Sequence, residues 1–282
     1  MMPSLIVTGD DFGASLGVNS AIVRAYDEGI LTGASLLVTG ECASEAVVLA
    51  RERPQLATGL HLALCDATSA SPPGAIPDLV TPDGRFPASP GRTGMVYWIW
   101  RRRRSGQLEK EIRAQVERYL ETGLPLDHVD GHHHLHMHPV VFDILLRCME
   151  DYKIPWVRLV EEDRRARRPG DPLLGEIVAA IFGLLAAHNR RALRRLGAAF
   201  APDCVFGLRA TDRLDLQEWL RMLSWLRVST LEVYSHPNQD TDHGRRQLEA
   251  LCAPELRSAV EAAGYRLASS RESAQVHPGG AH

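Results

Sequence analysis

The chain has 282 residues, of which 45% are hydrophobic and 24% are charged, and its formal net charge is −3. This composition excludes a disordered, fibrous or coiled-coil protein. With 32 Lys and Arg against 35 Asp and Glu, the chain also lacks the overall positive charge that gathers nucleic acid. We expect a soluble globular protein without a nucleic-acid partner.

The chain begins with a short apolar run that meets Asp10 and Asp11 at once, and no basic segment precedes it. This pattern indicates a buried strand and not a signal peptide. The five cysteines are widely spaced and contain no C-x-x-C pair, which argues against disulfides and a thiolate metal site. The longest later apolar run, 177–187, is shorter than the ~20 residues that span a bilayer. We expect a cytoplasmic protein, with peripheral contact to the inner membrane face left open.

Short runs rich in Val, Ile and Leu predict seven strands along the chain. They are Leu5–Thr8, Ala34–Thr39, Ala57–Leu62, Leu126–Val129, Trp156–Val160, Thr230–Tyr234 and Tyr265–Ala268. Helical periodicity between them predicts Asn19–Glu28, Ala43–Arg51, Gln107–Glu121, Val140–Asp151, Leu216–Arg227 and Pro254–Ala263. The alternation predicts an α/β fold with a parallel sheet, open or closed into a barrel. We expect one domain over residues 1–270 and a tail over 271–282.

Two long excursions interrupt this alternation, at 65–106 and 161–213. The first is rich in Pro, Gly and Ser and ends in an aromatic stretch with Trp98 and Trp100. Its length predicts a functional loop or lid. The second holds an apolar helix-like segment between two Arg clusters. Aromatic rings beside cations and an Arg-flanked apolar helix are typical of a membrane surface. The alternative is that the tryptophans pack in the core and the helix covers the barrel.

Six of the twelve histidines lie between residues 128 and 138. Neutral imidazole is the commonest metal ligand in proteins. Strand alternation puts Asp130 and His132 on one face, whereas a helical turn would align His132 with His136. The cluster predicts a metal site, and the alternative interpretation is a polar surface loop.

Acidic or imidazole side chains follow three other predicted strands: Asp10 and Asp11, His61, and His236. The carboxyl ends of parallel strands meet on one face, where active sites are built. Carboxylate and imidazole ligands suit Zn²⁺, Mn²⁺, Fe²⁺ or Co²⁺ and, less naturally, Mg²⁺. One carboxylate of the adjacent pair can bind metal while the other stays free as a base. The residues therefore predict metal-dependent hydrolysis.

The same residues carry a resemblance to a known family. The main matching blocks are 5–13, 59–62, 128–136 and 232–237. From residue 4 to about 268 the chain resembles the YdjC-like carbohydrate deacetylases, which include chitooligosaccharide deacetylase. The resemblance implies a seven-stranded (β/α) barrel-like fold and hydrolysis of an N-acetyl group on a sugar. Blocks 59–64, 76–80, 83–86 and 122–129 are most similar to the hopanoid-biosynthesis-associated deacetylases, which act on an N-acetylglucosamine head group of a hopanoid lipid.

The resemblance also implies roles for individual residues. It implies that Asp11, His61 and His132 hold one divalent ion, Mg²⁺ or Zn²⁺, with His134 and His136 as alternate ligands. Asp10 is the implied base and His236 a second catalytic or substrate-contacting group. Arg158 would contact the substrate or orient a carboxylate. We also expect His134, Trp98 and Trp100 at the substrate.

Two other kinds of function compete with this interpretation. A metal-dependent glycosidase or phosphoesterase would use the same site, but a glycosidase needs two carboxylates flanking the scissile bond, and Asp10 and Asp11 are too close in sequence to straddle a sugar easily. A sugar-binding protein without activity needs the cavity but no base. The expected partner is an N-acetylated amino sugar or glycolipid, and a homodimer is left open.

Overall fold

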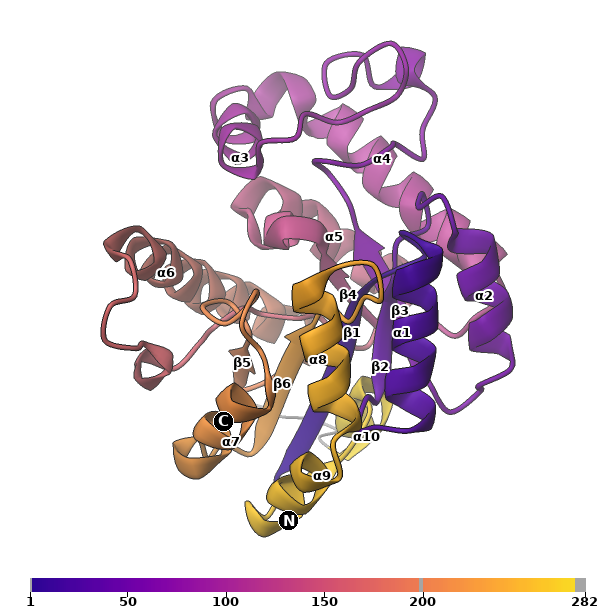
Figure 1. Ribbon diagram of the computed structural model, residues 1–282. Coiled ribbons are helices and arrows are strands. Elements are labelled where there is room, and N and C mark those ends of the chain that lie inside the picture. Colours follow the sequence, from indigo (N-terminus) through magenta and orange to yellow (C-terminus); the bar gives the residue numbers. More distant parts are fainter. Residues whose placement is uncertain (1, 198–199, 277–282) are drawn as a thin grey trace.

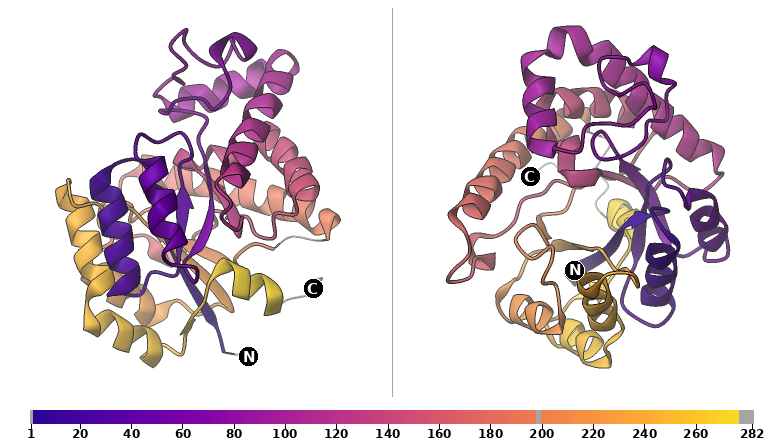
Figure 2. Two further views of the ribbon diagram at one scale, coloured as in Figure 1. Left: turned by 90° about the vertical axis from the view of Figure 1, so that its right-hand side faces the viewer. Right: turned by 45° about the horizontal axis from the view of Figure 1, so that its top comes forward.

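A curled sheet of seven parallel strands forms the centre of the fold, with helices around it (Figures 1 and 2). The computed structural model describes residues 2–197 and 200–276. The strands are β1 (Ser4–Phe12), β2 (Gly33–Leu36), β3 (Ala57–Leu62), β4 (His128–Gly131), β5 (Cys204–Phe206), β6 (Thr230–Ser235) and β7 (Arg266–Leu267). Their order is β4-β3-β2-β1-β6-β5, and β7 pairs with β1. The sheet is a half-barrel, which confirms the predicted α/β class with parallel strands.

Helices connect the strands and cover the convex side of the sheet. They are α1 (Leu16–Asp27), α2 (Ala43–Arg51), α3 (Pro90–Ile99), α4 (Arg101–Glu121), α5 (Pro139–Tyr152), α6 (Leu173–Leu196), α7 (Leu216–Trp225), α8 (Asp242–Cys252), α9 (Pro254–Ala262) and α10 (Ser270–Val276). Three short 3₁₀ turns, η1 (Pro73–Ala75), η2 (His132–Met137) and η3 (Arg164–Ala166), lie between them. Each predicted helix coincides with one of these within a few residues, apart from the start of α4.

One predicted strand is replaced by another. Trp156 and Val157 form only isolated bridges, with Phe200 and Val129 respectively, so the segment 156–160 is extended beside β4 without forming a full ladder. The additional strand β5 pairs with β6 inside the second excursion. Its three-residue apolar run is too short to stand out in the sequence. The count of about seven strands is confirmed, although one member differs.

The described residues of the two excursions and of the C-terminal segment belong to the fold. The first contains η1 and α3 and is held by Glu111, whose carboxylate accepts hydrogen bonds from the backbone N–H groups of Ala70 and Ser71, both at 2.8 Å. The second contains η3, α6 and β5. Residues 270–276, placed mostly in the predicted tail, form α10 instead, and Arg271 binds Asp127 at 2.7 Å. Residues 277–282 lie outside the described residues.

A buried arginine occupies the interior of the half-barrel. Arg158 is 1% exposed and binds Asp10 of β1, Asp130 of β4 and Glu232 of β6 at distances of 2.6 to 2.7 Å. In the sheet β4 and β6 have three strands between them. In a flat sheet with ~4.8 Å between strands they would lie about 19 Å apart. One guanidinium reaches both strands only because the sheet is curled.

The charges in this cluster compensate one another. Burial by itself would lower the pKa of the Arg158 guanidinium, but Asp10, Asp130 and Glu232 raise it well above its ordinary value. Removing the cation would leave three carboxylates in the barrel interior, and an uncompensated buried charge is strongly destabilising. Arg158 therefore links β1, β4 and β6 across the interior of the curled sheet.

We expect Arg158→Met to lower the free energy of unfolding by about 3 to 5 kcal/mol, because it removes the shared partner of three buried carboxylates. Urea denaturation at pH 7 measures the loss. Arg103→Met is the matched control, since Arg103 is exposed and binds Asp78 on the surface, where a pair contributes about 0 to 1 kcal/mol. Equal losses in the two variants would contradict the structural role given to Arg158.

Candidate active site

A β-bulge at the end of β1 brings two neighbouring aspartates to one site. Gly9 pairs with Ala34 and Phe12 pairs with Leu36, so Asp10 and Asp11 together lie opposite one residue of β2. Asp11 has φ of 62°, the left-handed conformation that such a bulge uses. In a regular strand successive side chains point to opposite faces. The bulge changes this, and both carboxylates line the same cavity.

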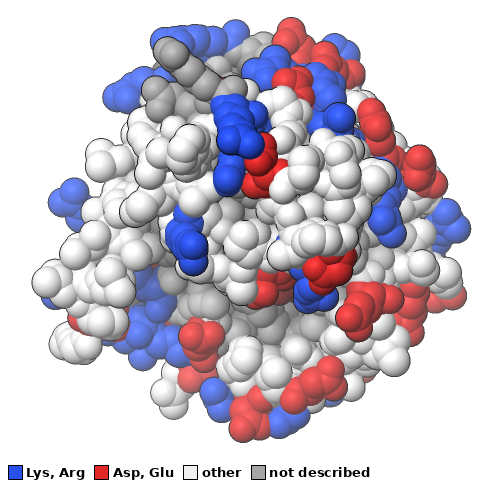
Figure 3. Space-filling view, turned by 90° about the horizontal axis from the view of Figure 1, so that it is seen from above, with Lys and Arg blue, Asp and Glu red and all other residues white. Residues whose placement is uncertain are grey.

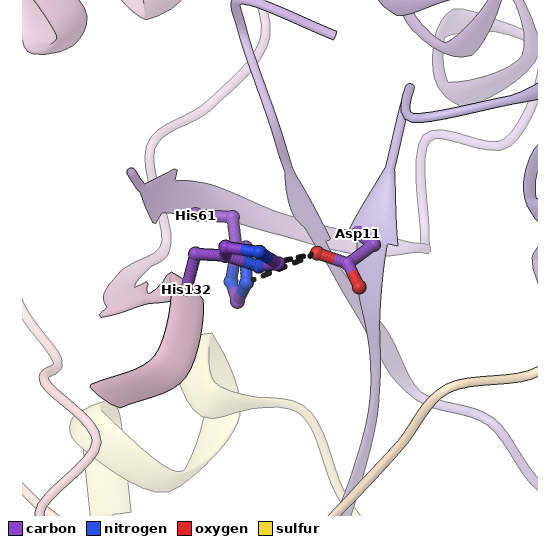
Figure 4. A group of neighbouring side chains, drawn as sticks. All are labelled: Asp11, His61 and His132. Carbon is purple, nitrogen blue, oxygen red and sulfur yellow. Dashed lines mark hydrogen bonds and ion pairs between the residues drawn. The ribbon is translucent and has the colours of Figure 1, made fainter. Parts of the chain in front are cut away.

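Asp11, His61 and His132 converge on one point from three strand ends (Figure 4). Oδ1 of Asp11 lies 2.9 Å from Nδ1 of His132 and 3.4 Å from Nε2 of His61. Burial would raise the pKa of the Asp11 carboxyl, but hydrogen bonds with His132 and His61 hold it well below its ordinary value. The structure brings together the three residues for which a shared metal ion was predicted.

The orientation of His61 is set from the opposite side of its ring. His61 and Asp130 are direct neighbours in the β3–β4 ladder, and Nδ1 of His61 lies 2.7 Å from Oδ1 of Asp130. A carboxylate on one ring nitrogen fixes the tautomer and leaves the other nitrogen, Nε2, available for a metal. Burial would lower the pKa of the His61 imidazole, but Asp130 and Asp11 raise it well above its ordinary value.

Asp130 is itself held by a line of hydrogen bonds that crosses the sheet. Ser35 of β2 donates to Oδ2 of Asp130 at 2.7 Å, and its hydroxyl lies 3.0 Å from Nε2 of His128. The other ring nitrogen of His128, Nδ1, lies 3.2 Å from the hydroxyl of Ser270 in α10. Gly59 of β3 lies between Ser35 and His128 in the sheet. A Cβ atom on Gly59 would come within 2.3 Å of the His128 ring. A glycine is required there, because any side chain would displace His128.

The donor set fits a divalent metal ion. Two imidazoles and one carboxylate, with ligand atoms within 4.8 Å of one another, match the three-ligand arrangement of hydrolytic metal sites. A second group, Asp10, His61 and Asp130, has similar spacing. That group is less suitable, because Arg158 binds both of its carboxylates and its positive charge would repel a cation.

Asp10 lies beside this group, held by Arg158 and close to His236. Both of its oxygens accept from Arg158, at 2.7 and 2.8 Å. Nε2 of His236 is 4.0 Å from Oδ2 of Asp10. Arg158 is buried and absent from the cavity lining, so of the two roles expected for it the structure gives it the contact with carboxylates. Contact of Arg158 with substrate stays a prediction.

The other histidines of the cluster have separate positions. Nε2 of His134 lies 2.9 Å from the Tyr234 hydroxyl, and that of His136 lies 2.8 Å from the backbone carbonyl of Arg158. Neither belongs to a potential metal group among the described residues. Burial lowers the pKa of both imidazoles, to about 4 for His136. His134 lines the cavity and His136 does not.

A cavity of about 650 Å³ opens above these groups. Its floor is formed by Asp10, Asp11, His61, His132 and His236. One wall is apolar and comes from α6, through Val178, Ile181, Phe182 and Leu185. Among the described residues that line it there is no Lys or Arg. The cavity therefore combines a polar floor with an apolar side and favours an uncharged ligand.

The two tryptophans expected at the substrate lie outside this cavity. Trp98 and Trp100 are each 51% exposed and do not line it, although the Trp98 ring is 6.1 Å from that of His138, which does. They do not pack in the core, so this part of the alternative is wrong, and their contact with substrate stays a prediction. Their exposure follows from α3 projecting above the strand ends (Figure 1).

Sequence reasoning gave no role to several residues that shape the site. Glu232 and Tyr234 lie in β6, and Ser35 lies in β2. A signal was present for Glu232, because a carboxylate in the middle of an apolar strand needs a buried partner. Nothing in the sequence marked the α6 residues as a cavity wall, since their partners are distant along the chain.

Known proteins resemble this chain in sequence. A carbohydrate deacetylase of Brevibacillus brevis is 41% identical over 165 residues, which are 57% of this chain and 62% of that protein. The chain therefore spans less than two thirds of that relative. A chitooligosaccharide deacetylase of Serratia marcescens is 29% identical over 283 residues, covering 95% of this chain and 98% of that protein.

A solved structure shares the fold of this chain, and a family model assigns its family. The crystal structure of an Enterococcus faecalis protein, described as a candidate for cellobiose-phosphate cleavage, has a TM-score of 0.73 and 22% identity over 97% of this chain and 99% of that one. It shares the fold. The model of the YdjC-like protein family matches residues 4–262. This match covers most of the chain, which therefore belongs to the YdjC-like family.

Proposed function

We propose that this protein is a metal-dependent hydrolase that removes the acetyl group from an N-acetylated amino sugar of the N-acetylglucosamine type. The observation that carries the proposal is the convergence of Asp11, His61 and His132 beside Asp10 and His236 at the floor of one cavity. Relatives named as carbohydrate and chitooligosaccharide deacetylases support the choice of substrate.

Asp11, His61 and His132 would hold one divalent ion, Zn²⁺ or Mg²⁺. A bound ion of this kind polarises a carbonyl and lowers the pKa of water. His61 is aligned for this task by Asp130, and Asp11 by the bulge in β1. All three side chains come from rigid strand ends, which keeps a ligand set in fixed geometry.

Asp10 would act as general base and His236 as the group that protonates the leaving amine. Two of the lone-pair positions of the Asp10 carboxylate are used by Arg158, and a carboxylate has about four. The remaining positions can accept a proton from water. Arg158 fixes the direction of this carboxylate and is a positioning residue. His236 is partly exposed at the cavity, where it can exchange protons with solvent.

The composition of the cavity favours deacetylation over the competing reactions. A phosphoesterase handles a charged phosphate, for which Arg and Lys are the usual side chains, and the described lining has neither. A glycosidase needs two carboxylates on either side of the bond. Asp10 and Asp11 adjoin at one bulge, so they are poorly placed to flank a glycosidic bond from its two sides.

The sugar is proposed to be linked to a lipid, of the hopanoid class suggested by the sequence. Apolar side chains are exposed on α3 and α6, the two helices beside the cavity: Met95, Trp98, Ile99, Trp100, Leu173, Leu174, Ile177, Ile181 and Leu184. Uncharged side chains cover much of the surface seen from above (Figure 3). Large exposed apolar patches mark sites of interaction.

Helix α6 supports contact with a membrane surface. The segment Leu173–Arg195 is long and apolar enough to cross a bilayer by length and composition alone, with a mean hydropathy of 1.3, and only 11% of this window is buried. Its inner side nonetheless belongs to the fold, since Ala186 and Leu193 are buried and Asn189 donates to the carbonyl of Met137 at 2.9 Å. We therefore propose that α6 lies on the membrane and does not cross it.

Chelation should abolish acetate release from an N-acetylglucosaminyl substrate, and added Zn²⁺ or Mg²⁺ should restore it. His61→Ala and His132→Ala should lose both the ion and turnover, because each removes a ligand. Elemental analysis of the dialysed proteins, together with an acetate assay, measures this. His188→Ala, an exposed histidine on α6, is the control and should keep both. Full turnover after complete removal of metal would refute the metal dependence.

Asp10→Asn should bind metal like the wild type but lose about 10²- to 10⁴-fold in kcat, the usual effect of removing a general base. The fold should persist at reduced stability, because Arg158 keeps Asp130 and Glu232 as partners. Asp212→Asn changes another carboxylate of the cavity lining and should have little effect. If Asp10→Asn kept a near-normal rate, His236 or another carboxylate would have to be the base.

The protein should co-sediment with anionic liposomes at low salt, and binding should weaken as salt screens its arginines over ~8–10 Å. Trp100→Ser/Leu184→Ser, which removes apolar groups from both helices, should reduce binding several-fold. The control Val48→Ser changes an exposed residue of α2, away from this face. No binding to anionic liposomes at low salt would leave a soluble amino sugar as the substrate.

A further inference from the structure

We propose that Asp66 and His133, together with His132, form a second and weaker site for a transition-metal ion at the mouth of the cavity. The inference concerns ion binding alone and does not depend on which reaction the protein catalyses. It does share His132 with the inner group of Asp11, His61 and His132.

The three side chains have donor atoms within 4.8 Å of one another. Nε2 of His133 is 3.8 Å from Oδ2 of Asp66, and the rings of His132 and His133 have centroids 4.2 Å apart. Tetrahedral ligation at about 2.1 Å separates donor atoms by about 3.4 Å. Small rotations of the exposed His133 and Asp66 side chains would close the remaining gap.

The backbone around this group adopts an uncommon conformation. Four of the five non-glycine residues with positive φ in the described chain surround the two groups: Asp11, Asp66, His133 and His134. A non-glycine residue in this region costs of order 1 kcal/mol or more. Asp66 follows β3 and His133 lies in η2, 67 positions further along the chain, yet both take this conformation and meet. Such outliers gather at functional sites.

The chemistry of the donors selects the kind of ion. Two imidazoles and one carboxylate suit Zn²⁺, Co²⁺, Ni²⁺ or Cu²⁺, whereas Mg²⁺ prefers oxygen ligands and retains its water. Within the described part of the chain, His133 is the one cationic partner of Asp66, whereas Asp10 and Asp130 both bind Arg158. The outer group can therefore accept a cation without displacing an arginine.

Sharing His132 makes the outer site the weaker of the two. Its Nδ1 faces Asp11 at 2.9 Å, which leaves Nε2 as the donor for the outer ion. When both ring nitrogens bind metal, the imidazole must release its remaining N–H proton to solvent, and this costs affinity. An ion held there would stand beside the cavity that His132 and His133 line, so an excess of such metal should obstruct substrate entry.

Equilibrium dialysis against Co²⁺ or Zn²⁺ counts the ions without reference to turnover. We expect a tight and a weak ion in the wild type, the tight one alone in His133→Ala and Asp66→Asn, and the weak one alone in His61→Ala. His61→Ala/His133→Ala should bind neither, while His188→Ala should match the wild type. Unchanged melting temperatures for His133→Ala and Asp66→Asn would show that these exposed substitutions leave the fold intact.

A weak ion that persists in both His133→Ala and Asp66→Asn, or a wild type with one ion only, would overturn the second site. Where acetate release is measurable, its inhibition by excess Zn²⁺ should be relieved at least 10-fold in Asp66→Asn. Failure of the proposed function would appear differently, as absent turnover with the ion counts unaltered.

Discussion

The guanidinium of Arg158 is the interaction on which the site depends. It joins carboxylates from β1, β4 and β6, strands that only a curled sheet brings within reach of one side chain. Its positive charge compensates the buried carboxylates of Asp10 and Asp130. Each of these then has a second task, since Asp10 faces the cavity and Asp130 orients His61. The same contacts thus stabilise the fold and align the chemistry.

A line of hydrogen bonds supports the potential metal ligand His61 from residues far from the cavity. From Ser270 of α10, hydrogen bonds pass through His128 and Ser35 to Asp130. A small residue, Gly59, makes room for the His128 ring within the sheet. A buried polar chain of this kind is stable only when its members are satisfied. The C-terminal helix therefore contributes to the position of a ligand at the opposite end of the strands.

The cavity joins two kinds of surface that a substrate would have to match. Its floor carries carboxylates and imidazoles, and its α6 wall carries aliphatic and aromatic groups. The exposed outer residues of α6 and α3 continue this apolar character onto the surface. An amphiphilic molecule, with a polar group to be hydrolysed and an apolar part beside it, satisfies both surfaces. A purely polar sugar would leave the apolar wall in contact with water.

The sequence by itself determined the parallel α/β class, most strand positions and the Asp and His residues at the strand ends, because these follow from local patterns of apolar residues and from the direction of parallel strands. The sequence also predicted different tasks for Asp10 and Asp11. Only the tertiary structure decided the bulge that brings both to one cavity, the three carboxylates of Arg158, the wall formed by α6 and the meeting of Asp66 with His133. Each of these joins residues distant in the chain, and such contacts leave no periodic pattern in the sequence.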